Sequence, residues 1–206
     1  MYTQEFWDEV YRHHNGDAPW LTDIWAKAMI DEFAKYIDAK QPKKILDYGC
    51  GNGKIGMYFL KQQHNVEFAE ISHEMVKELN AVVNNQVPIY LVEYPREITQ
   101  KYDYIIASGV FHHLNPEVWP EFLEQFYYLL NPGGKLLISG ANKDDAILLD
   151  NHNNAPMTNH FCWEISSLPT MIDNSKWQTN ADYNVKVKLD AFDQYRTMRI
   201  LVLAKL

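Results

Sequence analysis

Residues 45–53 read ILDYGCGNG, the segment that most strongly indicates the fold class. Two apolar residues lead into Asp47, and three glycines then fall within five positions. The apolar pair predicts a short buried strand, and the glycines predict a tight turn in which a ligand lies against bare main chain. A strand that runs through such a turn into a helix is typical of the first unit of an open α/β sheet.

Outward from this turn, strands alternate with helices along most of the chain. The expected strands after the first lie at 66–69, 87–92, 104–107 and 135–139. The expected helices lie at 54–63, after the capping residue Ser72, and from Asn115-Pro116 to Leu130. This alternation predicts a parallel sheet with helices on both faces.

The two ends of the chain follow different patterns. Residues 1–40 predict a helical cap, with one amphipathic helix at 3–14 and a second that begins after Thr22. Residues 185–206 alternate between apolar and polar side chains in two runs too close for a parallel crossover, so we expect an antiparallel hairpin. Residues 141–184 predict a substrate cap with one helix near 166–175. The whole is expected to be one domain, with its cofactor-binding core at 43–140.

Composition excludes several classes of protein. The chain has 206 residues, 47% of them hydrophobic, and a formal net charge of −8. That charge argues against nucleic acid as the main partner, since phosphate binding needs clustered Lys and Arg. Cys50 and Cys162 lie in unrelated contexts and predict no disulfide. No run is apolar enough to span a membrane, so we expect no membrane partner and a cytoplasmic location. A monomer or a homodimer is expected.

Acidic residues end the first two predicted strands, at Asp47 and Glu70. Residues 51–56 also match the GxGxxG pattern of dinucleotide-binding proteins, and an NAD-dependent oxidoreductase would use Glu70 as well. Asp47 argues against that alternative, because a carboxylate would repel a pyrophosphate. The same carboxylate would attract the ammonium group of S-adenosylmethionine, while Glu70 would bind its ribose hydroxyls and Ile71 would lie against its adenine.

Four segments in order resemble the motifs of class I S-adenosylmethionine-dependent methyltransferases. They are residues 45–53, 70–72, 102–114 and 130–138. The resemblance implies a Rossmann-like, seven-stranded, mostly parallel α/β sheet with its last strand inserted antiparallel. It also implies S-adenosyl-L-methionine as cofactor, S-adenosyl-L-homocysteine as product, and a small-molecule methyl acceptor. A non-catalytic protein that keeps the same pocket stays open as a second alternative.

The resemblance extends to individual site residues. The family often places Asp after the third strand, and here Glu93 takes that place. The opening of the chain is similar to the thiopurine and tellurite methyltransferase branch, where aromatic side chains close over the ligands. The candidate cofactor-binding residues are Asp47, Gly49, Cys50, Gly51, Asn52, Gly53, Glu70, Ile71, Glu93, Tyr94, Ser108, Gly109, Trp20 and Tyr11.

Two histidines follow the fourth predicted strand and are the candidate catalytic residues. His112 or His113 could act as a general base if the acceptor must lose a proton, although a structural role in the cofactor loop is favoured. His152, His160 and Cys162 match no compact ligand spacing, so we expect no metal.

Overall fold

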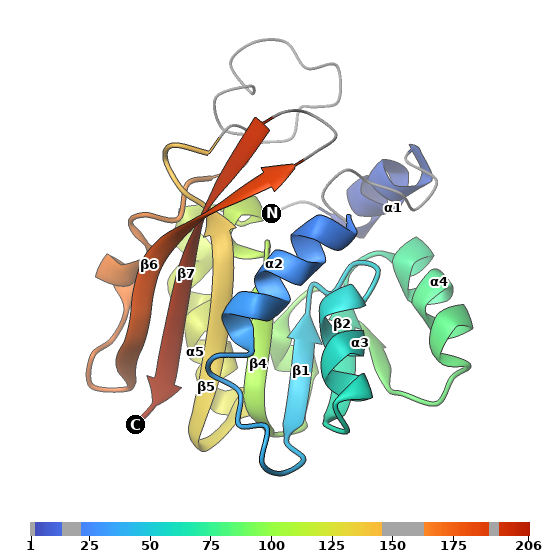
Figure 1. Ribbon diagram of the computed structural model, residues 1–206, viewed down its shortest axis with the longest axis horizontal. Helices are drawn as coiled ribbons and strands as arrows, with labels where there is room; N and C mark the ends of the chain where they lie inside the picture. The colour runs from blue at the N-terminus through green and yellow to red at the C-terminus, as the bar shows by residue number, and fades with distance from the viewer. Residues whose placement is uncertain (1–2, 14–21, 146–162, 190–193) are drawn as a thin grey trace.

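A computed structural model describes residues 3–13, 22–145, 163–189 and 194–206 (Figure 1). Seven strands form one sheet in the order β3-β2-β1-β4-β5-β7-β6. The strands are β1 (Lys44–Tyr48), β2 (Asn65–Glu70), β3 (Ile89–Leu91), β4 (Tyr102–Ser108), β5 (Leu130–Ala141), β6 (Trp177–Leu189) and β7 (Gln194–Lys205). The α-helices are α1 (Gln4–His13), α2 (Asp23–Phe33), α3 (Lys54–Lys61), α4 (His73–Val83) and α5 (Trp119–Leu129). The short 3-10 helices are η2 (Pro95–Glu97), η3 (Phe111–His113), η4 (Pro116–Val118) and η5 (Leu168–Met171).

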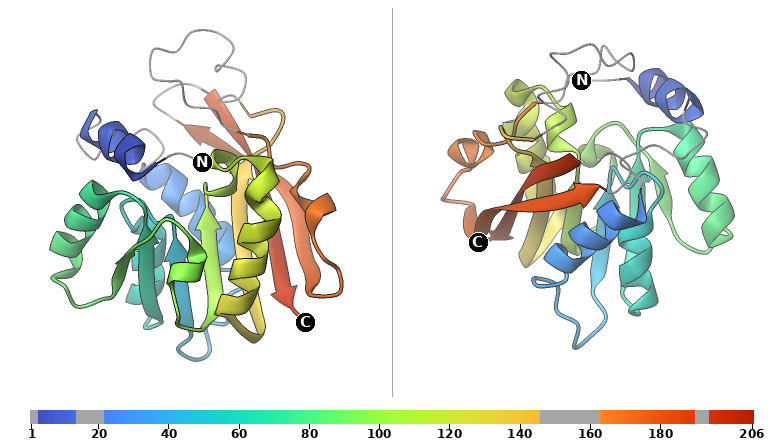
Figure 2. Two further views of the ribbon diagram at one scale, coloured as in Figure 1. Left: turned by 180° about the vertical axis from the view of Figure 1, so that it is seen from behind. Right: turned by 45° about the horizontal axis from the view of Figure 1, so that its top comes forward.

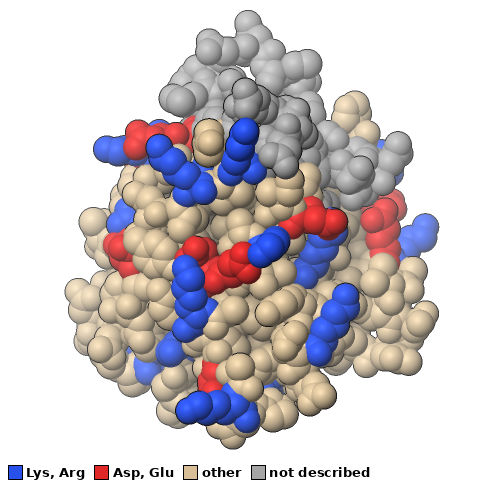
Figure 3. All heavy atoms as spheres, viewed as in Figure 1, with Lys and Arg blue, Asp and Glu red and all other residues tan. Residues whose placement is uncertain are grey.

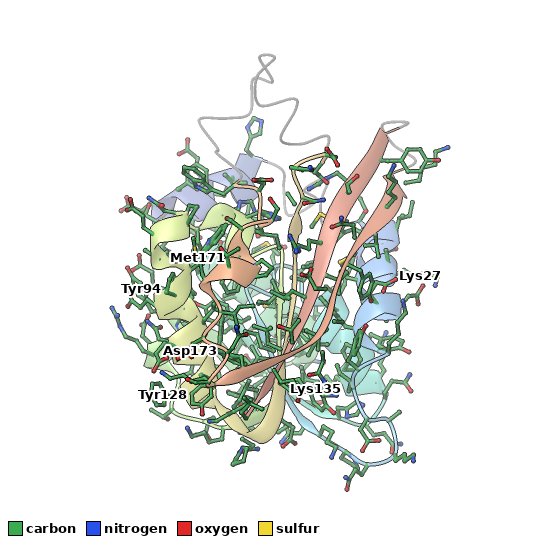
Figure 4. All side chains as sticks on the ribbon, turned by 90° about the vertical axis from the view of Figure 1, so that its left-hand side faces the viewer. Lys27, Tyr94, Tyr128, Lys135, Met171 and Asp173 are labelled. Atoms are coloured by element: carbon green, nitrogen blue, oxygen red, sulfur yellow. The ribbon has the colours of Figure 1, made fainter. Side chains whose placement is uncertain are left out.

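Helices cover both faces of the sheet (Figures 1 and 2). The edge view in Figure 4 shows α5 on one side, with Tyr94 and Tyr128, and α2 on the other, with Lys27. Apolar side chains of α5 and η5 pack with one face of the strands, whereas those of α2, α3 and α4 pack with the other. β4 contributes to both clusters through Ile105 and Ile106, which are fully buried. The strongly apolar central strands are thus explained by burial on both faces.

The last strand lies inside the sheet. β7 pairs antiparallel with β5 on one side and with β6 on the other, while β1, β2, β3, β4 and β5 pair in parallel. This is the arrangement that the resemblance implied, and the predicted fold class is confirmed.

Several predicted boundaries were wrong. β6 begins at Trp177 and not at Val185, because a register shift between Thr179 and Ala181 breaks the alternation by which a strand is recognised. The helix predicted near 166–175 is only the four-residue η5. The helix predicted from Asn115 starts as η4, and α5 begins at Trp119.

The N-terminal helix α1 docks on the start of α4. Asp8 accepts hydrogen bonds from the Ser72 hydroxyl at 2.6 Å and from the Glu74 N–H at 3.2 Å. Trp7, Tyr11 and Met75 form a small buried cluster beside these bonds. A carboxylate at the amino end of a helix is stabilised by the helix dipole, so Asp8 joins α1 to the core electrostatically as well as by packing.

The chain between β4 and α5 is held by one buried indole. Trp119 is fully buried, and its Nε1–H is shared between the carbonyls of Phe111, at 3.0 Å, and Leu114, at 3.1 Å. These two carbonyls flank His112 and His113. The first residue of α5 therefore fixes the turn that carries both candidate catalytic histidines.

We expect Trp119→Phe to destabilise the protein by about 1–3 kcal/mol, because it leaves buried carbonyls without this donor. Urea unfolding followed by circular dichroism measures the change. Trp163→Phe is the matched control, since Trp163 is 41% exposed. Equal stability of the two variants would show that the shared indole hydrogen bond contributes nothing.

Candidate functional site

The strand order of the sheet reverses between β1 and β4. In an open α/β sheet, ligands bind at the carboxyl ends of the strands where the order reverses. β1 and β2 carry Asp47 and Glu70 near their carboxyl ends, and β4 is followed by Gly109. The topology therefore brings the two predicted acids and the predicted β4 loop to one edge.

The glycine loop after β1 depends on backbone angles that favour glycine. Gly49, Gly51 and Gly53 have φ values of 67°, 52° and 71°. The N–H groups of Gly49 and Cys50 both donate to the carbonyl of Ala69, at 2.8 and 3.2 Å. Left-handed backbone is adopted readily by glycine and reluctantly by other residues, so the three glycines let the chain turn within hydrogen-bond reach of β2.

Glu70 binds this loop from the neighbouring strand. One carboxylate oxygen accepts the Gly51 N–H at 2.7 Å, and the other accepts the N–H groups of Ile71 at 2.8 Å and Ser72 at 3.0 Å. The residue is 4% exposed. Burial raises the pKa of Glu70, and the three backbone N–H groups oppose that rise. Glu70 thus ties the glycine loop to the start of α4.

Asp47 performs a similar task for α3. Gly53 precedes this helix and has no side chain to cap it, but an Asp47 oxygen accepts the Gly56 N–H at 2.8 Å. Gly56 must remain glycine, since a Cβ there would lie 2.8 Å from that oxygen and 2.4 Å from Phe68. Burial raises the pKa of Asp47 to about 7, despite the Gly56 N–H, and the nearby charge of Glu70 adds to the rise.

His112 and His113 lie against each other directly after β4. His112 Nδ1 accepts the Ala141 N–H at 3.1 Å, and the two Nε2 atoms are 2.9 Å apart. A neutral His112 must therefore carry its proton on Nε2 and donate it to His113. If His113 also carried a proton on Nε2, two N–H groups would face each other and this hydrogen bond would be lost. This geometry favours the structural role for the pair.

Aromatic side chains of α1 lie close to these histidines. The Trp7 ring meets the His113 ring edge-on at a centroid distance of 4.9 Å, and Tyr11 lies 6.0 Å from Trp7. Ile71 packs against the same cluster. The structure thus brings Tyr11 and Ile71, both predicted site residues, to the edge of the sheet where the parallel strands end, which we call the mouth of the sheet. Trp20 lies outside the described residues.

The remaining predicted residues have more varied positions. Ser108 Oγ lies 2.8 Å from Ser139 Oγ, and Gly109 N–H donates to the Ser139 carbonyl at 2.9 Å. Glu93 is exposed, and its backbone carbonyl accepts the Tyr48 hydroxyl at 3.1 Å. Tyr94 is partly buried, as are Cys50 and Asn52 in the glycine loop.

Sequence reasoning assigned no role to some residues that shape the site. Asp8 and Gly56 are two such residues, and only the glycine spacing of the second gave any signal. His152, His160 and Cys162 lie outside the described residues. Within the described part, no three His, Cys, Asp or Glu side chains are grouped as a metal site requires. No helix in that part is long and apolar enough to cross a bilayer.

Known proteins resemble this chain in sequence and in fold. Residues 21–183 match the family described as "Methyltransferase domain". The chain is 27% identical over 194 residues to the glycine/sarcosine N-methyltransferase of Halorhodospira halochloris, a match that covers 89% of this chain and 70% of that protein. It is 25% identical over 183 residues to the tRNA N(3)-methylcytidine methyltransferase trm140 of Schizosaccharomyces pombe, covering 77% and 56%.

A solved structure shows the same fold. The magnesium protoporphyrin IX methyltransferase (ChlM) of Synechocystis PCC 6803 with bound SAH superposes with a TM-score of 0.72 at 15% identity, covering 98% of both chains. The chain spans about half the length of several of the curated relatives that it matches.

We expect Asp47→Asn to stabilise the protein at pH 8 by up to about 4 kcal/mol, because Asn can accept the Gly56 N–H without burying a charge. The folded pKa of Asp47, about 7, exceeds its ordinary value of 3.8. The folded state therefore holds the extra proton between these values, and the cost of the buried charge grows as pH rises. The advantage of Asn should shrink by about 2 kcal/mol at pH 5.

Urea unfolding at pH 5 and pH 8 measures both differences. Asp144→Asn, at an exposed position, is the control and should show neither. An Asp47→Asn effect that is the same at both pH values would contradict the raised pKa.

Proposed function

Since the chain belongs to the methyltransferase domain family, we propose that it transfers a methyl group from S-adenosylmethionine to a small-molecule acceptor. The observation that carries the proposal is the pair of buried acids that bind the glycine loop at the point where the strand order reverses. Among the described residues, no cation lies beside either carboxylate as a cause of its pKa shift. Such buried carboxylates favour a positively charged ligand and would repel a pyrophosphate.

Each predicted contact with the cofactor has a physical basis. Asp47 attracts the ammonium group of the donor, and the loop from Gly49 to Gly53 approaches its amino-acid end through bare backbone. Glu70 binds the ribose through Oε2, which accepts one backbone N–H and keeps a second lone pair for a hydroxyl, whereas Oε1 already accepts two. Ile71, Glu93 and Tyr94 surround the adenine, and Ser108 and Gly109 complete the pocket beside β4. Tyr11 supplies an aromatic wall for a cation–π contact with the sulfonium, and the same role is proposed for Trp20, which lies outside the described residues.

The reaction requires positioning more than acid–base chemistry. The sulfonium already makes the methyl group electrophilic, so transfer is an in-line displacement that forms the acceptor–carbon bond as the sulfur–carbon bond breaks. Holding donor and acceptor in line supplies about 7–11 kcal/mol in well-oriented reactions. The His112–His113 pair serves the site by anchoring the turn after β4 to Ala141, which supports the structural role over that of a general base.

A small molecule is the favoured acceptor because of the charge of the protein. The net charge is −8, and on the face in Figure 3 acidic and basic side chains are interspersed and form no single basic patch. Phosphate backbones are bound by such patches. The names of two relatives give glycine or sarcosine as the acceptor of one and tRNA as the acceptor of the other. We also propose that the enzyme is cytoplasmic.

We expect Asp47→Asn and Glu70→Gln each to weaken S-adenosylhomocysteine binding at least tenfold, because a full charge-assisted contact becomes a neutral one. Isothermal titration calorimetry at pH 8 measures the affinity. Glu78→Gln, at an exposed position on α4, is the matched control and should bind like the parent. Parent-like affinity in both site variants would place the cofactor elsewhere.

A panel of small thiols, amines, phenols and metalloid oxyanions tests the activity, with release of S-adenosylhomocysteine as the signal. We expect at least one acceptor to be methylated. Two further arms separate the alternatives. Methylation of total tRNA in place of the small molecules would refute the acceptor class, and binding of NAD but not of S-adenosylhomocysteine would favour an oxidoreductase.

A further inference from the structure

Two arginines on β7 are bound in different ways. Arg199 uses all three of its guanidinium nitrogens. Its Nε and Nη2 donate to the two oxygens of Asp182, at 2.6 and 2.7 Å, and its Nη1 donates to the Ser166 carbonyl at 2.8 Å. This is a bidentate ion pair with a third hydrogen bond to the backbone, and Arg196 can be compared with it.

Arg196 uses only one nitrogen fully, although it is more deeply buried, with 8% of its surface exposed. Its Nε donates to both oxygens of Asp145, at 2.7 and 3.0 Å. Within the described part of the chain, Nη2 contacts only the Met198 sulfur, at 3.9 Å, and Nη1 has no acceptor. A thioether is a weak acceptor. The outer edge of this guanidinium therefore keeps buried donors without adequate partners, which native proteins rarely tolerate.

The neighbours of Arg196 fix its position but provide no strong acceptor for its Nη groups. Asp145 is fully buried and also accepts the Thr197 N–H at 2.7 Å, so the carboxylate itself is fixed. The Trp25 ring lies 5.5 Å from the guanidinium carbon. A guanidinium fixed through Nε, with its Nη groups unused, is preorganised for a planar anion that accepts two parallel hydrogen bonds.

Arg196 lies at the same edge of the sheet as the glycine loop. Asn142, directly after β5, donates its N–H to the Thr197 carbonyl at 3.0 Å, and the preceding Ala141 is the residue that His112 binds. On the other side, Trp25 lies in the first turn of α2, which begins at Asp23. The Asp23 carboxylate lies 2.6 Å from Lys54, the first residue after the glycine loop. Arg196 thus lies between the β5 end and α2, both of which contact parts of the candidate site.

We propose that the Nη edge of Arg196 binds a carboxylate of the methyl acceptor, so that the substrate is a carboxylic acid. The role of this ligand as methyl acceptor rests on the proposed function. A carboxylate matches the two Nη groups in geometry and charge, whereas an amide or ester can satisfy only one donor well. The positive sulfonium of the donor would further favour an anion in the same mouth.

Paired probes test this assignment by direct binding. Acetate, benzoate and succinate are titrated against acetamide, benzamide and succinamide, with and without S-adenosylhomocysteine, and followed by ligand-observed NMR. We expect at least one acid to bind the parent at least tenfold more tightly than its amide. The double variant Arg196→Gln/Asp145→Asn removes the pair without stranding a buried charge, and it should lose that preference.

Two further variants keep the test decisive. Arg199→Gln/Asp182→Asn removes the arginine–aspartate pair that joins β7 to β6 and should keep the parent preference. Arg196→Lys keeps the charge but not the fork, and should bind the acid about tenfold more weakly than the parent; it also serves if the double variant fails to fold, as judged by thermal unfolding.

The outcomes separate this proposal from the function on which it rests. A preference for acids that survives in the Arg196 variants, or the absence of any saturable acid binding to the parent, overturns the carboxylate site. Failure of the parent to bind S-adenosylhomocysteine by calorimetry overturns the cofactor assignment instead. Cofactor binding and methyl transfer that persist alongside an unaltered acid preference refute the Arg196 site alone.

Discussion

Two buried carboxylates hold the mouth of this sheet together by accepting backbone N–H groups. Asp47 binds the start of α3, and Glu70 binds both the glycine loop and the start of α4. Each acid thus stabilises the helix that follows its own strand, and Glu70 also binds the loop after the neighbouring β1; burial of the charge raises the pKa of both. The arrangement is stable enough to shape the loop, and its unbalanced negative charge favours a cationic ligand. Structure and ligand preference follow from the same two side chains.

Much of the fold could be predicted because its signals are local. The glycine spacing after β1, the acid at the end of β1 or β2, and the alternation in β7 are each contained within a few consecutive residues. Errors arose where a local signal was interrupted. The early part of β6 has an irregular register that hides its alternation, and the region of η5 contains Pro169 and forms only one short turn. The start of α5 was misplaced because two prolines, Pro116 and Pro120, can each begin a helix.

The site was predicted in its local half only. Asp47, the glycine loop and Glu70 belong to consecutive elements, so their proximity follows from the topology. The contacts of Asp8 with Ser72 and of Arg196 with Asp145 join residues 64 and 51 positions apart. No periodicity or spacing encodes such contacts, since they depend on how α1 docks and on which loop follows β5. The histidine pair was noticed in the sequence, but its orientation depends on the Ala141 N–H, which only the three-dimensional structure supplies.

The position of β7 also bears on how the chain folds as it is synthesised. β5 and β6 are both made before β7 and do not pair with each other. β6 finds its neighbour, and β5 its second neighbour beside β4, only when residues 194–205 become available. Until then the nascent sheet exposes the unpaired backbone edge of β5, the kind of edge that invites mispairing with other chains. Synthesis from the N-terminus therefore leaves closure of the sheet to β7, and the edge of β5 stays open to mispairing until that strand is in place.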